Sequence, residues 1–153
     1  MQYGKFRALV SKINDTEENM GRIKVKCPTI YGVNESPWCT PCMPCVGDNI
    51  GIFMFPSIGD SVWIEFEEGD VDYPIWVGGF WQSRKTPFGT DYSTEKIVIT
   101  TATGAKIVIN SLKNTIEVTG DTTITGDLNV TGDITSSKTI IDTTGNTNNH
   151  THP

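Results

Sequence analysis

Histidine is nearly absent from this chain, and aromatic residues are missing from its second part. The 153 residues contain two histidines, at positions 150 and 152, and no Trp, Tyr or Phe follows Tyr92. Residues 93–153 also lack cysteine and methionine, and they contain 16 threonines. Large apolar side chains offset the entropy lost on folding, so this second part cannot build a compact core alone. The first part can, because it holds every aromatic residue.

Other absences exclude several classes of function. No apolar run is long enough to span a bilayer. The net charge of −6 disfavours a nucleic-acid partner. The N-terminus lacks the pattern of a signal peptide, so we expect synthesis in the cytoplasm without a secretion signal.

Catalytic motifs are missing as well. The chain has no G-x-S-x-G elbow, no P-loop and no H-E-x-x-H. The acidic run at residues 65–72 reads as a solvated strand end and turn rather than as a glycosidase carboxylate pair. We therefore expect no enzymatic activity.

Residues 1–92 carry short candidate strands separated by turn residues. Arg22–Cys27, with the sequence RIKVKC, alternates apolar and charged residues in the period of a half-buried strand. The predicted strands are Tyr3–Lys12, Arg22–Cys27, Ile50–Phe55, Ser61–Glu67 and Ile75–Phe80. Five such strands without helical periodicity predict a small closed or half-closed barrel such as an OB-fold.

A six-residue repeat runs through the threonine-rich part. Its copies read VTGDTT, ITGDLN and VTGDIT, beginning at Val118, Ile124 and Val130. From 115 to 139 every odd position is Thr, Glu, Asp, Asn or Ser, whereas the apolar residues are even-numbered. The even set is Ile116, Val118, Ile124, Leu128, Val130, Ile134 and Ile140. Successive strand residues face opposite sides, so the pattern predicts one apolar face, with bends at the glycines.

An earlier stretch follows the opposite phase. Its apolar residues are Ile97, Ile99, Ala105, Ile107 and Ile109, and the phase changes at the turn-like Asn110–Asn114. A ribbon with one thin apolar face is not stable alone in water. Three copies around a common axis would bury that face, which favours an intertwined trimeric β-helix. A flat sheet or a single-chain solenoid is the alternative, although each repeat is short for a solenoid turn.

The two histidines share the even parity of the apolar residues. If that parity continues to the end of the chain, His150 and His152 of three chains would place six imidazoles around one axis. Six nitrogens suit an octahedral ion, so Fe(II) is preferred over zinc, which favours tetrahedral sites. The alternative is a solvated terminus with two incidental histidines.

The cysteines form the other arrangement that could carry chemistry. Cys39, Cys42 and Cys45 follow one another at x₂ spacing, with Cys27 upstream. Four thiolates could hold zinc or an iron–sulfur cluster. Structural burial of the thiols is the preferred interpretation, and a disulfide formed after release from the cytosol is a third.

Several motifs resemble a known family. Gly21-Arg22 opens a strand, and the chain continues with Ser36-Pro37-Trp38, Pro56-Ser57-Ile58-Gly59-Asp60 and Gly69-Asp70 before Tyr73-Pro74 and Gly78. With the Val/Ile-Thr-Gly-Asp repeats and the terminal His-Thr-His, this order resembles the central spike proteins of contractile phage tails and the tip proteins of type VI secretion systems.

The resemblance implies a homotrimer with an OB-fold collar, a β-helical needle and one iron ion per trimer at the tip. It also implies baseplate hub proteins as partners, a virion or tail-like particle as location, and a target cell envelope that the needle pierces. Some family members carry a lysozyme-like domain between collar and needle, for which this chain has no room.

We therefore predict an all-β protein with four segments. Residues 1–82 form the OB-fold collar, 83–94 a linker, 95–144 the triple-stranded β-helix, and 145–153 the metal-binding tip. The rival prediction is an OB-fold module that binds a glycan or an oligonucleotide on a fibre stalk. A small electron-transfer metalloprotein built on the cysteines is a second rival.

Overall fold

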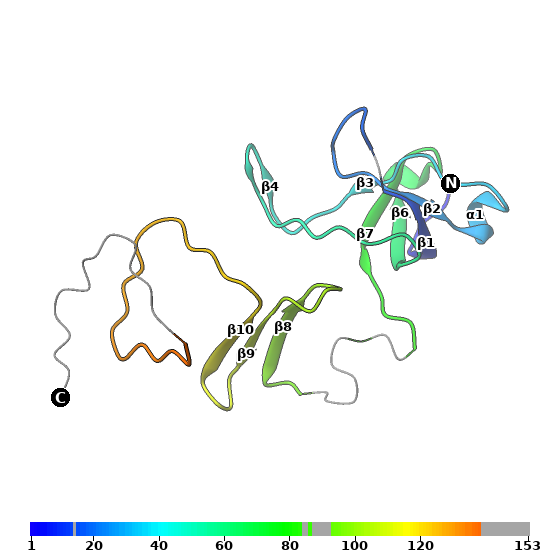
Figure 1. The fold of residues 1–153 in the computed structure, drawn as a ribbon. Helices are drawn as coiled ribbons and strands as arrows, with labels where there is room; N and C mark the ends of the chain where they lie inside the picture. Colours follow the sequence, from blue (N-terminus) through cyan, green and yellow to red (C-terminus); the bar gives the residue numbers. More distant parts are fainter. Residues whose placement is uncertain (14, 84–85, 87–92, 139–153) are drawn as a thin grey trace, which may run out of the picture. The chain divides into compact units, whose positions relative to one another are not determined.

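The computed structural model describes residues 1–13, 15–83, 86 and 93–138. The chain divides into two units, Met1–Thr94 and Glu95–Pro153 (Figure 1). Among the described residues, none of the helices has the length and apolar character that crossing a membrane requires.

The first unit is built on a curled five-stranded sheet. The strand order is β2-β1-β6-β7-β3, and all neighbours are antiparallel except β3 and β7 (Figure 1). The strands are β1 (Phe6–Lys12), β2 (Lys24–Lys26), β3 (Thr40–Pro41), β6 (Ser61–Phe66) and β7 (Pro74–Gly79). This half-barrel confirms the predicted all-β class, and the helices are short: α1 (Pro28–Tyr31) and the 3₁₀ turn η1 (Glu67–Gly69).

Alternation along the strands places one set of side chains in the core. Val25 and Ile64 are fully buried, whereas their neighbours Lys26 and Glu65 reach solvent on the other face. The buried apolar set is Ala8, Val10, Ile23, Val25, Cys27, Cys39, Val62, Ile64, Phe66 and Trp76. Full burial of one aliphatic side chain contributes about 1.5–3 kcal/mol, so this inner face holds the sheet closed.

A tight turn before β6 holds that strand against β1. The Asp60 carboxylate accepts a hydrogen bond from the Ser57 N–H at 2.8 Å. The Gly59 N–H donates to the Val10 carbonyl, and the Val10 N–H donates to the Asp60 carbonyl, each at 2.9 Å. The motif PSIGD is therefore a structural corner of the barrel.

The predicted strand Ile50–Phe55 is wrong. Only Ile50–Gly51 belongs to a paired strand (β5). It pairs with Val46–Gly47 (β4) in a separate hairpin that Figure 1 shows extending away from the five-stranded sheet. The fifth strand of the sheet is instead β3. An apolar run predicts burial but does not identify what buries it, and here Phe53 and Phe55 stay 57% and 37% exposed.

The other predicted strands are confirmed with shifted ends. Strand β1 begins at Phe6 rather than Tyr3, because Gly4 has a φ of 101° and interrupts the extended backbone. Strand β2 ends at Lys26, because Pro28 opens the helix α1.

The second unit contains a three-stranded antiparallel sheet of order β10-β9-β8. Its strands are β8 (Lys96–Thr100), β9 (Lys106–Asn110) and β10 (Thr115–Thr119). The predicted phase change is confirmed as the turn between β9 and β10, where Asn114 has a φ of 52° and the Asn110 side chain accepts a hydrogen bond from the Lys113 N–H at 3.0 Å.

Residues 120–138 contain no regular strand within the described part of the chain, but they bend at regular intervals. Gly120, Gly126 and Gly132 have φ values of 118°, 124° and 143°. L-residues rarely adopt these angles, so the glycine of each six-residue repeat is required by the backbone. The intertwined β-helix stays a prediction.

Candidate functional site

The sheet of the second unit has an apolar face that stays largely exposed among the described residues. Two rows cross its three strands, Ile116–Ile109–Ile97 and Val118–Ile107–Ile99, because these residues are direct cross-strand partners. Their exposed fractions run from 40% for Ile107 and Ile109 to 71% for Ile116. We call these six residues the apolar grid.

The opposite face of the same sheet is mostly polar. Lys106 lies between Thr100 and Thr119 across the strands, and Asn110 lies between Lys96 and Thr115. The centre of this face is apolar, however, because Val98 and Val108 are direct partners there. The predicted division into one apolar and one polar face is therefore correct for residues 115–119, whereas in residues 96–110 the predicted apolar set shares one face and two valines lie on the other. The apolar grid is the feature of this unit that can bind another protein surface, since exposed apolar patches mark such sites.

The predicted metal ligands His150 and His152 lie outside the described residues, as does most of the linker at 83–94. Within the described residues, no three His, Cys, Asp or Glu side chains are grouped as metal ligands.

The four cysteines fall into two classes. Cys27 and Cys39 are fully buried in the barrel core, whereas Cys42 and Cys45 are exposed. Burial raises the pKa of the Cys27 thiol, and it raises the pKa of Cys39 to about 11 although the nearby Ser36 hydroxyl opposes the shift. Both buried thiols are therefore protonated and unreactive at neutral pH.

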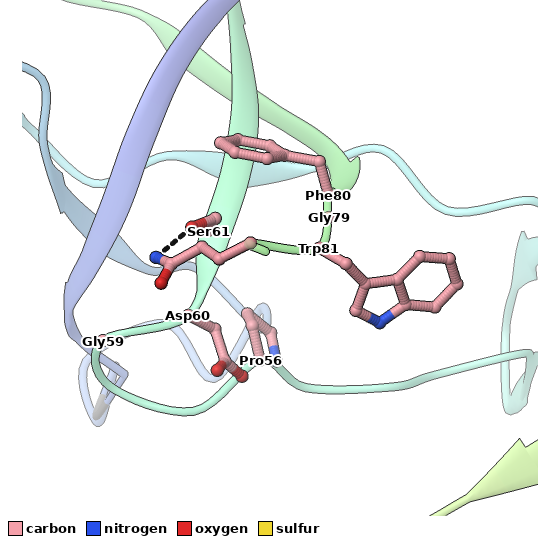
Figure 2. Close-up of a pocket in the computed structure, with 8 residues that line it drawn as sticks. Pro56, Gly59, Asp60, Ser61, Gly79, Phe80 and Trp81 are labelled. Carbon is pink, nitrogen blue, oxygen red and sulfur yellow. Dashed lines mark hydrogen bonds between the residues drawn. The ribbon is translucent and has the colours of Figure 1, made fainter. Parts of the chain in front are cut away.

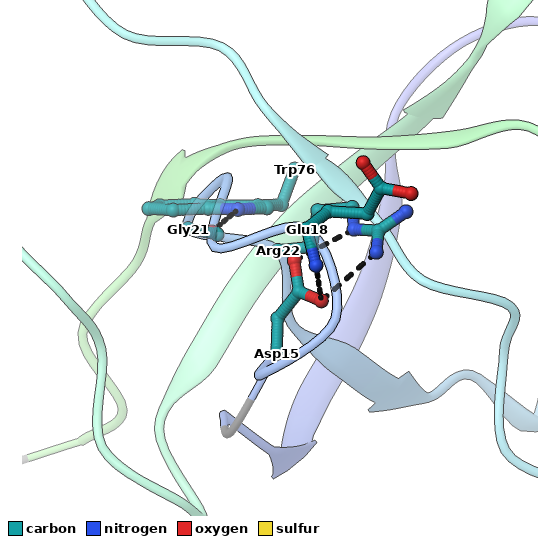
Figure 3. A network of polar contacts seen from close by, with 5 residues as sticks. All are labelled: Asp15, Glu18, Gly21, Arg22 and Trp76. Atoms are coloured by element: carbon teal, nitrogen blue, oxygen red, sulfur yellow. Dashed lines mark hydrogen bonds and ion pairs between the residues drawn. The ribbon is translucent and has the colours of Figure 1, made fainter.

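The Gly21-Arg22 motif organises one end of the barrel (Figure 3). Arg22 donates from Nε and Nη2 to the two carboxylate oxygens of Asp15, at 2.7 and 2.8 Å. The hydrogen bond from Arg22 lowers the pKa of Asp15 to about 2 from an ordinary value of 3.8, although burial opposes the shift. This bidentate pair fixes the loop between β1 and β2 against the sheet.

Gly21 is favoured by its backbone conformation. Its φ is 74°, which L-residues rarely adopt, and a Cβ there would lie 2.7 Å from a ring carbon of Phe53, so that ring would have to move. The Trp76 indole N–H donates to the Gly21 carbonyl at 3.4 Å (Figure 3). The motif residues at this end therefore serve the fold rather than a reaction.

Three positively charged side chains lie near the ring of Trp38, in the motif Ser36-Pro37-Trp38. The Lys12 and Lys24 ammonium groups each lie 5.3 Å from its ring centroid, and the Arg22 guanidinium lies 5.8 Å away. Cations at this distance from an aromatic ring are attracted to it. Sequence reasoning missed this cluster, although the alternation of charged residues in RIKVKC was a signal for it.

An open hollow of about 420 Å³ lies where the barrel ends (Figure 2). It is lined by Pro56, Gly59, Asp60, Ser61, Gly79, Phe80, Trp81 and Gln82. The Gln82 amide donates to the Ser61 hydroxyl at 2.7 Å, and Asp60 is held by the Ser57 N–H. The Asp60 carboxylate and the Ser61 hydroxyl, which line the hollow, are therefore already hydrogen-bonded within the barrel.

Comparison with known families identifies the first unit. Residues 6–81 match the family model described as the type VI secretion system/phage-baseplate injector OB domain. No curated protein matches the chain. The first unit belongs to this injector family, and the chain is a spike-related protein with an OB domain. Its role is a structural one associated with a baseplate, in a virion or a tail-like particle.

The pKa of Asp15 predicts a pH dependence of stability. Because the folded-state value is depressed, the pair with Arg22 stabilises the fold fully above about pH 4 and ceases to do so as pH falls through about 2. We expect Asp15→Asn to lower the thermal unfolding midpoint by several degrees at pH 7 and to flatten its fall between pH 4 and 2. Asp48→Asn, at an exposed position, is the control. Parallel pH profiles for both variants would contradict the prediction.

Burial of two thiols predicts a biphasic reaction with a thiol reagent. In the native protein at pH 8, Cys42 and Cys45 should react quickly, whereas Cys27 and Cys39 should react only after unfolding. Titration with a chromogenic disulfide, with and without guanidinium, measures this. Four fast thiols in the native state would show that the core around Cys39 opens readily.

Proposed function

We propose that three copies of this chain form the envelope-piercing central spike at the baseplate hub of a contractile tail or tail-like injection machine. In this proposal the OB domain is a collar that docks on hub proteins. The second unit is a trimeric β-helical needle directed at the target envelope. The apolar grid is the observation that carries the proposal beyond the family match.

The apolar grid requires a partner on energetic grounds. Six β-branched side chains remain 40–71% exposed on a sheet of three short strands. Burying the remaining area would contribute about 1 kcal/mol for each side chain, on the order of 6 kcal/mol per chain. A sheet this small is marginal without such cover. Three copies that turn their grids to a common axis supply it without any other protein.

The six-residue repeat beyond β10 supports a trimer axis that continues past the three-stranded sheet. Its apolar residues keep their exposure after the sheet ends, with Ile124 at 56%, Val130 at 43% and Ile134 at 66%. The left-handed glycines recur every six residues between them. A chain that turns at a fixed interval and keeps one apolar side fits a helix wound from three chains better than it fits a globular domain.

The metal site at the tip rests on parity and ligand chemistry. His150 and His152 follow the even numbering of Ile116 and Ile134, which would turn both imidazoles inward. Three chains then supply six nitrogens, and an octahedral set of imidazoles suits Fe(II), one ion per trimer. When bound, the ion would hold the three chain ends together by coordination.

The alternative function, glycan binding by the OB domain, has one observation in its favour. Trp81 is 63% exposed beside the hollow of Figure 2, and its indole combines an apolar ring face with an N–H donor, as contact with a sugar ring would need. However, Asp60 and Ser61 are already hydrogen-bonded within the barrel corner. The spike accounts for both units, whereas glycan binding accounts only for the first.

A charge at the centre of the apolar grid should prevent trimer formation. Ile107 lies on the middle strand, so Ile107→Asp would bring three carboxylates toward one apolar axis, at a cost of several kcal/mol. We expect sedimentation velocity to give a trimer for the wild type and a monomer for this variant. The matched control is Thr119→Asp, on the polar face of the same sheet. A trimeric Ile107→Asp protein would contradict the arrangement.

Metal content tests the tip separately. Untagged protein purified without nickel resin should contain about one iron per trimer. His150→Ala/His152→Ala should lose it, and Thr151→Ala should keep it. Because neutral imidazole is the ligand, binding should weaken as pH falls below about 6.5. A trimer that contains no metal would contradict the metal site at the tip but not the β-helical needle.

A further inference from the structure

Unpaired positive charge collects on the outer face of β1 and β2. Lys12 ends β1, and Lys24 begins β2. The register places these two lysines directly opposite each other. We call Lys12 and Lys24 the basic face, and within the described residues neither of them makes an ion pair. Lys26 and Arg7 are not part of it, because Glu35 lies opposite Lys26 and the Arg7 guanidinium lies over the rings of Trp63 and Phe80.

The basic face is unusual in a chain of net charge −6. Like charges directly opposite on neighbouring strands destabilise a sheet. Trp38 moderates the repulsion between Lys12 and Lys24 by accepting both ammonium groups at its ring. Arg22 adds no free charge, because Asp15 binds it. The arrangement is therefore left with positive charge that an anionic surface would stabilise.

Unpaired negative charge lies at the opposite end of the same barrel. The turn between β6 and β7, residues 67–73, exposes four carboxylates: Glu67, Glu68, Asp70 and Asp72. We call this segment the acidic turn. The Gly69 carbonyl accepts a hydrogen bond from the Gln2 N–H at 2.7 Å, so the turn lies at the start of β1, whereas Lys12 ends that strand. A seven-residue strand spans about 20 Å.

We infer that, in the proposed trimer, the basic face of each collar receives the acidic turn of the next copy. The inference rests on the trimer of the proposed function. Closed three-fold symmetry requires a contact between two different patches, since only two-fold contacts match a patch with itself. The collar carries two such patches of opposite charge at separate ends. Each turn also carries Tyr73, 61% exposed, which can pack between the charged groups.

Distance separates this contact from effects inside one chain. The Debye length is about 8 Å at physiological salt, so charges about 20 Å apart in one collar do not interact appreciably. A coupling between substitutions at Lys12 or Lys24 and substitutions at Glu67 or Asp70 therefore reports a contact between copies.

Charge exchange tests the inference in the full-length chain. One variant is Lys12→Glu/Lys24→Glu, the second is Glu67→Lys/Asp70→Lys, and the third combines all four substitutions. The control adds Asp121→Lys/Asp127→Lys, two exposed residues of the second unit, to the first variant. All four tryptophans lie in the first unit, so tryptophan fluorescence reports collar unfolding alone.

We expect the wild-type collar midpoint to fall as NaCl rises from about 0.05 M to about 0.5 M. Each two-residue variant should lower the low-salt midpoint by about 5 °C. The four-residue variant should recover most of that loss and regain the salt dependence. If the matched control also recovers the lost midpoint, the recovery depends on net charge rather than on a contact. That result would overturn the inference.

Mass measurements distinguish the possible failures. A monomeric wild type would overturn the proposed trimer, and with it this contact. If the wild type is a trimer and the two sets of substitutions have additive effects on the midpoint, the proposed spike remains supported. That result would overturn the contact between basic face and acidic turn. In that case the basic face would be free for an acidic surface of another baseplate protein.

Discussion

Burial of one thin apolar face is the constraint on which the rest of this protein depends. The strands β8, β9 and β10 place six β-branched side chains on the same side, and within the described part of the chain these side chains stay 40–71% exposed. Backbone hydrogen bonds hold the sheet together, but they do not remove this surface from water. In the proposed trimer, self-association around an axis would answer the constraint with identical surfaces, and it would allow the composition to remain as simple as it is after Tyr92.

The two units satisfy the hydrophobic effect in different ways. In the OB domain the inner face closes on itself, and Ile23, Val25 and Ile64 are fully buried within one chain. In the second unit Ile116 and Ile97 remain 71% and 62% exposed. The first unit can therefore bury its core within one chain, whereas in the proposed trimer the second unit would gain most of its stability from assembly. A spike of this kind would not lose one chain without exposing the apolar surfaces of the other two.

Sequence alone predicted those features that depend on local geometry. The parity of apolar residues predicted the apolar face of the second sheet, because the two-residue period belongs to the extended backbone itself. It also gave the turn at residues 110–114. Sequence reasoning failed for Ile50–Phe55, because an apolar run does not show which segment packs against it. It also failed for β3, a two-residue strand that pairs with β7 far along the chain. The basic face was missed because the alternation in RIKVKC does not show that Lys12 of another strand lies opposite Lys24. The histidine tip lies outside the described residues.

Hydrophobic attraction brings chains together but determines their register weakly. A six-residue repeat can slide by one unit along a neighbour and still place apolar residues against apolar residues. The repeats at Val118, Ile124 and Val130 differ too little to prevent such a shift. Register must therefore come from parts that do not repeat. The collar has that property, since its turns and its unlike charged ends occur once in each chain. In the proposed trimer a contact between basic face and acidic turn would align the three chains before the needle closes.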